Sequence, residues 1–324
     1  MIQRLARGVA ALAAAFLVAG LAAAPAWSAQ AAGDDLKLKS SAVLVMDEQT
    51  GEVLYGKNTD AVVPIASITK LMTAMVTLDA GLDLNEQIEI TTEEIDITRG
   101  SGAKARLPRG AALSRDDMLH LALMASENRA AAALASSYPG GLDAFVAAMN
   151  AKARLLDMND TRFADPTGLT AENVSSAEDL AKLVRAANDY PLIREYSTSP
   201  SHEVAINGRR AQFGNTNALV KSNDWEIGLQ KTGFIRAAGR CLVMYAKLAA
   251  RPVVIVLLDS VGKYTRLVDA ARIREWLEPG YNAPTGLVRA EAARPRAAAK
   301  KPVAVARKTT ATPRASAQFK PAAR

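Results

Sequence analysis

One stretch of the chain decides how the rest is interpreted: PIASITKLMTAMV, residues 64–76. After Ser67, apolar side chains recur with the spacing of one buried helical face, at Ile68, Leu71, Met72, Met75 and Val76. Ser67 is therefore predicted to begin a helix, where unpaired backbone N–H groups and the positive end of the helix dipole favour negative charge on its oxygen. Lys70 follows one turn later on the same side, within reach of that oxygen.

A serine followed three residues later by lysine is a weak signal alone, because the spacing recurs at residues 101–104 and 260–263. The first recurrence lies among glycines, which indicates a loop, and the second follows the apolar run 253–258, which indicates the end of a strand. Only Ser67 precedes a helical pattern. Even there, an N-cap serine with a solvated lysine would be the ordinary explanation.

Two further motifs change that interpretation: Ser126-Glu127-Asn128 and Lys231-Thr232-Gly233. A Ser-x-x-Lys tetrad with these partners is the motif set of serine enzymes that transfer acyl groups through a covalent acyl-serine. The pKa of an ordinary lysine is about 10.4, so Lys70 can act as a base only if burial or a second cation lowers its pKa. Lys231 is a candidate for that second cation.

Strands are predicted near both ends of the body, with mostly helices between them. The predicted strands are 42–46, 52–55, 226–231, 240–247 and 252–259, and a last helix covers 265–277. Ser114 and Ser176, each with Asp three residues later, predict the starts of two further helices. The pattern indicates a mixed α and β fold, in which an antiparallel sheet is flanked by helices and an all-helical lobe is inserted between its strands. A catalytic groove between the lobes would receive Ser67 and Ser126 from the helical side and Lys231 from the sheet edge.

The two ends of the chain differ in composition from the body, residues 34–280, which is long enough to bury its own core. Residues 1–29 combine a positive start, an apolar run and small residues, the pattern of a cleaved secretory signal peptide. An uncleaved anchor is the alternative, although the run is short for a bilayer span.

Residues 281–324 carry ten Lys and Arg against one acid, so the net charge of +7 belongs to the ends and not to the body. Their richness in Ala and Pro predicts a disordered basic arm that contacts anionic cell-envelope polymers, or a solubilising tail without a partner. Nucleic acid is not an expected partner outside the cytoplasm.

The sequence lacks the residues that other kinds of hydrolase need. The chain contains two histidines, His120 and His202, and neither stands in a Ser-His-Asp motif. His120 lies within an apolar helical pattern and is expected to be structural. The single cysteine, Cys241, excludes an internal disulfide and is expected to pack inside a strand. With no close ligand spacing, neither a metal nor another cofactor is expected.

In this order and context the motifs resemble the low-molecular-mass penicillin-binding proteins, the serine-type D-alanyl-D-alanine peptidases, whose fold is β-lactamase/DD-peptidase-like. The resemblance runs from Val45 to about Leu277 and includes DPTGL at residues 165–169. The stretches LSRDDML (113–119), SENR (126–129) and AGRC (238–241) are most similar to the endopeptidase subgroup. The chain departs from many relatives at Ile235, where they carry a hydroxyl residue.

The resemblance implies a peptidase that acts on peptidoglycan stem peptides, with β-lactams as covalent inhibitors. The predicted signal peptide implies that it is secreted to the periplasm, where it is expected to be soluble or loosely associated with the envelope. The resemblance also implies that Ser67 is the nucleophile, Lys70 the general base and Ser126 a proton relay to the leaving amine. Substrate binding would fall to Asn128, Lys231, Thr232 and Gly233, and the backbone N–H groups of Ser67 and Phe234 would form the oxyanion hole.

Three other functions share features with a D,D-endopeptidase that cleaves D-alanine cross-links. A D-alanyl-D-alanine carboxypeptidase shares every motif, but the extra β-rich domain and amphipathic anchor of that subgroup have no counterpart in the sequence. A class A β-lactamase would need a deacylating glutamate in a Glu-x-x-Leu-Asn stretch, which the sequence lacks, so β-lactams are expected to inhibit. A non-catalytic wall-binding module is disfavoured by the three intact motifs.

Overall fold

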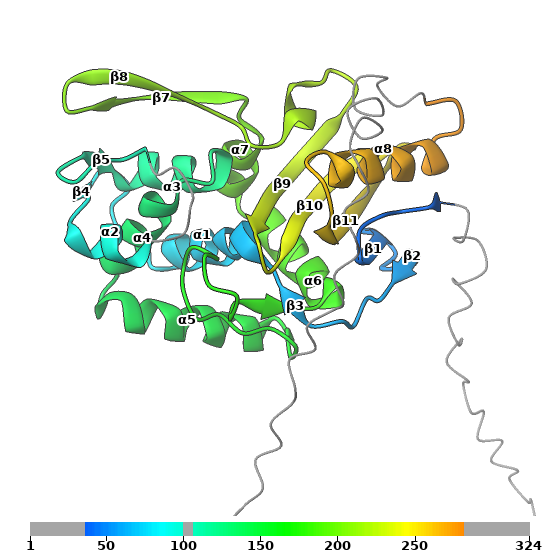
Figure 1. The fold of residues 1–324 in the computed structure, drawn as a ribbon, viewed down its shortest axis with the longest axis horizontal. Helices are drawn as coiled ribbons and strands as arrows, with labels where there is room; N and C mark the ends of the chain where they lie inside the picture. Colours follow the sequence, from blue (N-terminus) through cyan, green and yellow to red (C-terminus); the bar gives the residue numbers. More distant parts are fainter. Residues whose placement is uncertain (1–35, 100–105, 282–324) are drawn as a thin grey trace, which may run out of the picture.

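A computed structural model describes residues 36–99 and 106–281. The predicted signal peptide, almost all of the basic arm and the tetrad at 101–104 lie outside these residues. Figure 1 shows the main sheet at one end of the molecule and a group of helices at the other.

The main sheet is antiparallel, with the strand order β2-β1-β11-β10-β9. Its strands are β1 (Ala42–Asp47), β2 (Val53–Lys57), β9 (Glu226–Ile235), β10 (Gly239–Leu248) and β11 (Arg251–Ser260). Two strands from the start of the body thus join three from its end, as predicted. Because β9 is the edge strand, the Lys-Thr-Gly motif that it carries faces the helical part.

Helices α1 to α7 lie between β2 and β9 in the chain, which confirms the predicted insertion of helices between the strands. The inserted part is not all-helical as predicted, because its described residues also form three two-stranded sheets. The helices are α1 (Lys70–Asp79), α2 (Thr92–Ile97), α3 (Arg115–Met124), α4 (Asn128–Ser136), α5 (Gly141–Leu155), α6 (Ala177–Asn188), α7 (Pro191–Thr198) and α8 (Thr265–Leu277). Among the described helices, none combines the length and the apolar character needed to cross a membrane.

Short elements connect these helices. They are the 3-10 turns η2 (Ala66–Thr69) and η3 (Ala218–Lys221), the strands β3 (Val63–Pro64), β4 (Gln87–Glu89), β5 (Ala112–Ser114) and β6 (Val174–Ser175), and the hairpin of β7 (Ser201–Ile206) and β8 (Arg209–Gly214). The predicted helix starts are confirmed: Ser114 accepts a hydrogen bond from Asp117 N, and Ser176 from Asp179 N.

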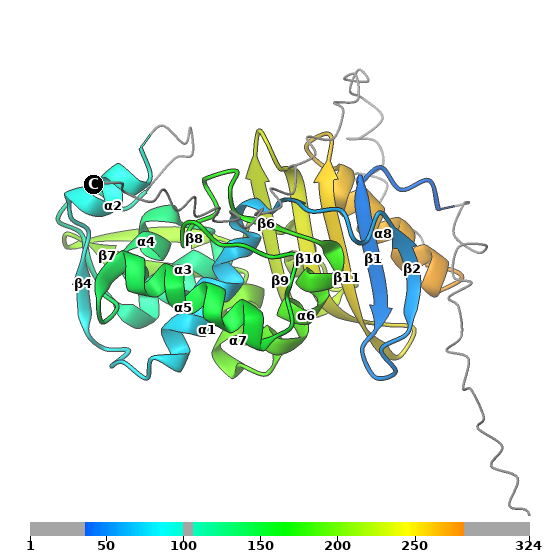
Figure 2. The same cartoon turned by 90° about the horizontal axis from the view of Figure 1, so that it is seen from below.

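Helices cover both faces of the sheet, with α6 on one face and α8 on the other (Figure 2). The central strand β11 is accordingly buried on both sides, since Val254 and Val256 pack in the core shared with the helical part, and Val253 and Ile255 pack under α8. This double burial explains the continuous apolar run from 253 to 258.

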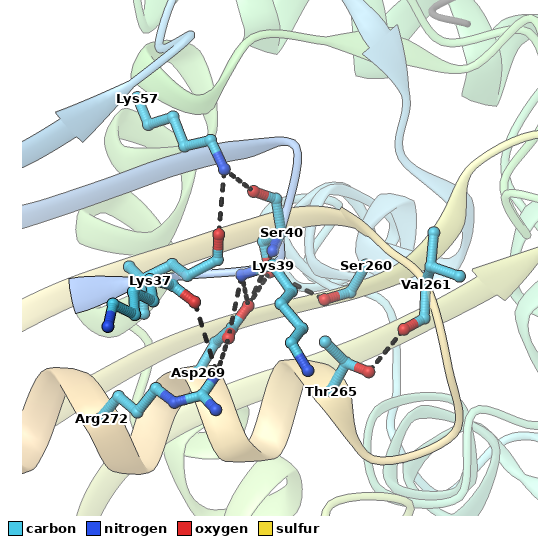
Figure 3. A network of polar contacts seen from close by, with 10 residues as sticks. Lys37, Lys39, Ser40, Lys57, Ser260, Val261, Thr265, Asp269 and Arg272 are labelled. Atoms are coloured by element: carbon cyan, nitrogen blue, oxygen red, sulfur yellow. Dashed lines mark hydrogen bonds and ion pairs between the residues drawn. The ribbon is translucent and has the colours of Figure 1, made fainter. Parts of the chain in front are cut away.

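Helix α8 is fixed to the start of β1 through the buried carboxylate of Asp269 (Figure 3). Asp269 accepts hydrogen bonds from Lys39 N at 3.0 Å and from Ser40 N and Ser40 Oγ at 2.7 and 2.8 Å. Burial raises the pKa of Asp269, and these hydrogen bonds oppose the rise. The network holds α8 against the segment that leads into β1, and the first turn of α8 reaches the site described next.

Candidate active site

Ser67 lies in the 3-10 turn η2, which leads directly into α1. The prediction that Ser67 begins a helix is therefore confirmed, and the first turn of that helix is 3-10. The turn starts at Ala66, which has a positive φ of 49°. That conformation is unusual for a residue with a side chain and marks a backbone held by its surroundings. Ser67 is 8% exposed and lines a pocket.

Lys70 is fully buried and points back at Ser67. Its Nζ atom donates to Ser67 Oγ at 2.9 Å, to Asn128 Oδ1 at 2.8 Å and to the carbonyl oxygen of Thr167 at 2.6 Å. Burial lowers the pKa of Lys70 to about 7, against the opposing charges of Asp165 and Glu127. At neutral pH the amine therefore exists in both protonation states, which suits a general base.

The Ser-Glu-Asn motif forms the link between α3 and α4. Ser126 has a positive φ of 57° and lines the same pocket as Ser67. Glu127 caps α4 by accepting from Ala130 N at 2.7 Å, and it also accepts from Arg106 N. Asn128 is the first residue of α4, where its side chain reaches Lys70. The middle residue thus holds the backbone while its two neighbours face the pocket.

The DPTGL stretch forms a loop that supports Lys70. Asp165 Oδ1 accepts from Thr167 N, Thr167 Oγ1 and Gly168 N. The buried Asn173 joins this loop to η2, because its Nδ2 donates both to Asp165 O and to Thr69 Oγ1. These bonds fix the carbonyl of Thr167 that accepts from Lys70.

The Lys-Thr-Gly motif lies on β9 against the turn of Ser67. A Cβ atom on Gly233 would lie 3.0 Å from Ile65 O and 3.2 Å from Ser67 N, so glycine allows the strand to approach this closely. Thr232 faces the pocket, and its hydroxyl oxygen is 2.7 Å from that of Thr216.

Lys231 is fully buried beside the site. Burial, followed by the charges of Lys70 and Arg266, places the pKa of Lys231 well below its usual value. Burial is thus the main cause of the low pKa of Lys70, one of the two explanations left open by the sequence.

The pocket that unites these residues has a volume of about 400 Å³. It brings together the predicted residues Ser67, Ser126, Asn128, Thr232, Gly233 and Phe234. It also includes residues that the sequence did not indicate, namely Leu169, Thr216, Ala218, Arg240, Lys263, Tyr264, Arg266 and Leu267.

Arg266 is notable among these because its side chain is buried with unsatisfied donors. Its Nε and Nη1 atoms make no hydrogen bond within residues 36–99 and 106–281. Burial and the charge of Arg240 lower the pKa of Arg266 to about 10, which still leaves a cation at neutral pH. A buried cation that lines a pocket with open donors is suited to an anionic group of a ligand.

The histidines lie outside this pocket. His120 stacks between Tyr196 and His202, with ring centroids 4.3 and 4.0 Å apart, and His202 Nε2 is 2.8 Å from Asp117 Oδ1. None of these residues lines the pocket of Ser67. In the described part of the chain, no group of three or more His, Cys, Asp or Glu is placed to hold a metal ion.

A serine at a helix start, a buried lysine against its oxygen and a strand-edge Lys-Thr-Gly motif form the site of a serine acyl-transfer enzyme, of the class that contains penicillin-binding proteins and β-lactamases. The sequence model of the D-alanyl-D-alanine carboxypeptidase family matches residues 28–262. The chain belongs to this family of serine peptidases, which act on peptidoglycan.

Individual relatives agree with the assignment. A D-alanyl-D-alanine endopeptidase of Pseudomonas aeruginosa is 52% identical over 246 residues, 75% of this chain and 79% of the relative. One of Escherichia coli is 48% identical over 250 residues, covering 76% and 80%. Among solved structures, a D-alanyl-D-alanine carboxypeptidase of Mycobacterium tuberculosis is 28% identical with a TM-score of 0.66, covering 75% and 93%. A DD-transpeptidase of Streptomyces is 26% identical with a TM-score of 0.69, covering 74% and 97%. The predicted family and fold are confirmed.

Proposed function

We propose that this protein is a serine D,D-endopeptidase that cleaves D-alanine cross-links of peptidoglycan through an acyl-serine intermediate. The observation that carries the proposal is the contact between Ser67 Oγ and the buried Nζ of Lys70, whose pKa lies at about 7. The two relatives that are about half identical to this chain are both endopeptidases by name.

In the acylation step, neutral Lys70 accepts the Ser67 proton while Ser67 Oγ bonds to the carbonyl carbon of a D-alanine residue. The C–N bond then breaks, and Ser126 relays a proton to the leaving amine. Water attacks the acyl-serine in the second step, which releases the shortened peptide and returns the proton to Ser67. The backbone N–H groups of Ser67 and Phe234 stabilise the oxyanion, each by roughly 3 kcal/mol as in other serine enzymes.

Substrate binding follows from the same geometry. Asn128 Oδ1 accepts from Lys70, so the Nδ2 group of Asn128 is available to a substrate carbonyl. The carboxylate next to the scissile bond is bound by Thr232 and Lys231, with the open donors of Arg266 beside them. Because β9 is an edge strand, an extended stem peptide can pair with it beside Gly233.

Digestion of purified muropeptides tests the endopeptidase assignment against a carboxypeptidase. We expect cross-linked dimers to be converted to monomers by the native protein and to persist with Ser67→Ala. Release of terminal D-alanine alone, with dimers persisting, would overturn the endopeptidase assignment.

We expect β-lactams to acylate Ser67 and the resulting acyl-enzyme to be hydrolysed slowly. The two carboxylates whose charges reach Lys70 are both engaged, since Asp165 holds its own loop and Glu127 caps α4. None of the described residues that line the pocket carries a carboxylate. Labelling by fluorescent penicillin should be lost in Ser67→Ala, and rapid nitrocefin turnover would contradict this view.

For the two ends of the chain we propose export and envelope contact. Residues 1–29 act as a cleaved signal peptide that delivers the enzyme to the periplasm, soluble or loosely attached, and the basic arm contacts anionic envelope polymers. Cell fractionation tests the first point. Sedimentation with purified sacculi, compared between the full chain and a chain ending at residue 281, tests the second.

A further inference from the structure

The pocket of Ser67 has two chemically different halves. One half holds the proposed catalytic groups. The other half is formed by the start of β10, by the turn that leads into α8 and by the first turn of α8. It contributes Arg240, Lys263, Tyr264 and Arg266. No carboxylate occurs among the described lining residues, so this half attracts anions.

The cations of this half lie at two depths. Arg266 is 7% exposed and lies next to the buried Lys231, whose pKa its charge lowers. In the proposed function this deep group, with Thr232, binds the one carboxylate that adjoins the scissile bond. Lys263 is exposed at the rim of the pocket and is left for a second anionic group farther from Ser67.

Aromatic rings accompany both outer cations. The Lys263 ammonium lies 5.1 Å from the centre of the Tyr264 ring, and the Arg240 guanidinium lies 4.3 Å from that of Phe234. Phe234 is 55% exposed, although it follows the Lys-Thr-Gly motif directly. Each pair therefore presents an apolar surface with a positive edge, which fits a chain of methylene groups that ends in a carboxylate.

The two kinds of D,D-peptidase substrate differ on this side of the bond. From a terminal D-Ala-D-Ala the leaving group is a single alanine with one carboxylate. From a cross-link it is the diamino acid of a second stem peptide, with methylene groups and additional carboxylates. A pocket of about 400 Å³ is within the usual range for ligands larger than one alanine.

We propose that Lys263, Tyr264 and Arg240, with the ring of Phe234, form a subsite for the second, leaving stem peptide of a cross-link and so favour cross-linked substrates. The inference rests on the proposed function and adds to it the residues that set substrate preference. The deep group of Arg266, Lys231 and Thr232 binds a carboxylate that both kinds of substrate carry. The rim subsite binds cross-linked substrates alone.

The test compares kcat/KM for a cross-linked dimer with kcat/KM for a pentapeptide monomer at low ionic strength, where an exposed charge is least screened. We expect Lys263→Ala to lower the dimer-to-monomer ratio about fivefold, and Lys263→Glu to lower it more, because a rim charge chiefly affects encounter and orientation. Inhibition by the free leaving peptide should weaken in parallel.

Arg209→Ala supplies the matched control, since Arg209 is an exposed cation on the β7–β8 hairpin and does not line the pocket. This variant should keep the wild-type ratio, and covalent labelling by fluorescent penicillin reports that each variant is folded. If both Lys263 variants keep the wild-type dimer-to-monomer ratio of kcat/KM, including the case in which both values fall equally, the inference is overturned while the proposed function stands. If the wild type cleaves no dimer, it is the proposed function that fails.

Discussion

Gly168 packs directly on the carbonyl group of Ala66, the residue before the proposed nucleophile. A Cβ atom on Gly168 would lie 2.0 Å from Ala66 O and 2.8 Å from Ser67 N, and Gly168 has a positive φ of 78°. The DPTGL loop therefore touches both the backbone of Ser67 and, through Thr167 O, the amine of Lys70.

Gly168→Ala should disrupt the site, because the added Cβ would clash with backbone atoms of Ala66, which cannot move aside as a flexible side chain can. We expect labelling by fluorescent penicillin to slow by at least about tenfold, since misplacement by about 1 Å can cost 10²-fold in rate. Gly208→Ala is the matched control: Gly208 has a φ of 76°, yet nothing lies within 4 Å of its added Cβ. Equal labelling rates for the two variants would show that the contact with Ala66 does not hold the nucleophile.

Acylation should depend on pH through Lys70. Burial lowers the pKa of Lys70 to about 7, and only the neutral amine can accept the Ser67 proton. The second-order rate of acylation by penicillin should therefore rise with pH, with an inflection near 7, and fall away on the acidic side. Lys70→Arg, which keeps its charge throughout this range, should acylate slowly at every pH. An inflection near 10 would mean that the lysine is solvated.

The buried Lys231 should destabilise the folded protein at neutral pH. Its pKa in the folded protein lies well below the unfolded value of 10.5, so the stability linked to this group is present above pH 10.5 and lost as the pH falls. Lys231→Met should therefore raise Tm at pH 7 while it weakens acylation, because the carboxylate loses a ligand. A lower Tm in this variant would indicate that the ammonium is paired in the folded state.

Asp269→Ala should destabilise the sheet lobe. It leaves the buried backbone donor of Ser40 and the partly buried one of Lys39 without their acceptor, at a cost of about 3 kcal/mol. For a domain of this size that cost lowers Tm by about 6–12 °C, measurable by calorimetry. Asp269→Asn keeps one acceptor oxygen, so its Tm should lie between those of the wild type and the alanine variant. An unchanged Tm in the alanine variant would contradict the role of this network.

The stacked His120 should make the protein sensitive to acid. Burial and the neighbouring His202 lower the pKa of His120 to about 4, against the charge of Asp117, and its Nε2 atom is buried without a partner among the described residues. Because the folded-state pKa is depressed, the linked stability is complete above pH 6.5 and is lost as the pH falls towards 4. Tm should drop over this window in the wild type and drop less in His120→Phe. Parallel pH curves for the two proteins would exclude His120 as the cause.

The catalytic motifs could be recognised from the sequence because each is local. Helical spacing distinguishes Ser67 from the other two tetrads, and Lys231 is marked by the two residues after it. Arg266 has no such signal, since its open donors exist only once α8 packs over β10 and β11. The β7–β8 hairpin had a signal that was missed: Asn207-Gly208, both at positive φ, is the preferred sequence of a two-residue hairpin turn.

In the main sheet, Ala42 at the start of the described body pairs with Leu258 near its end. The edge strand that carries Lys231 is joined to β1 only through β10 and β11. A chain emerging from a ribosome thus cannot complete the sheet until its last strands are out, since such distant pairing is slow and comes late. The active site, which needs the motif on the edge strand β9, can therefore form only after the last strands of the sheet have been synthesised.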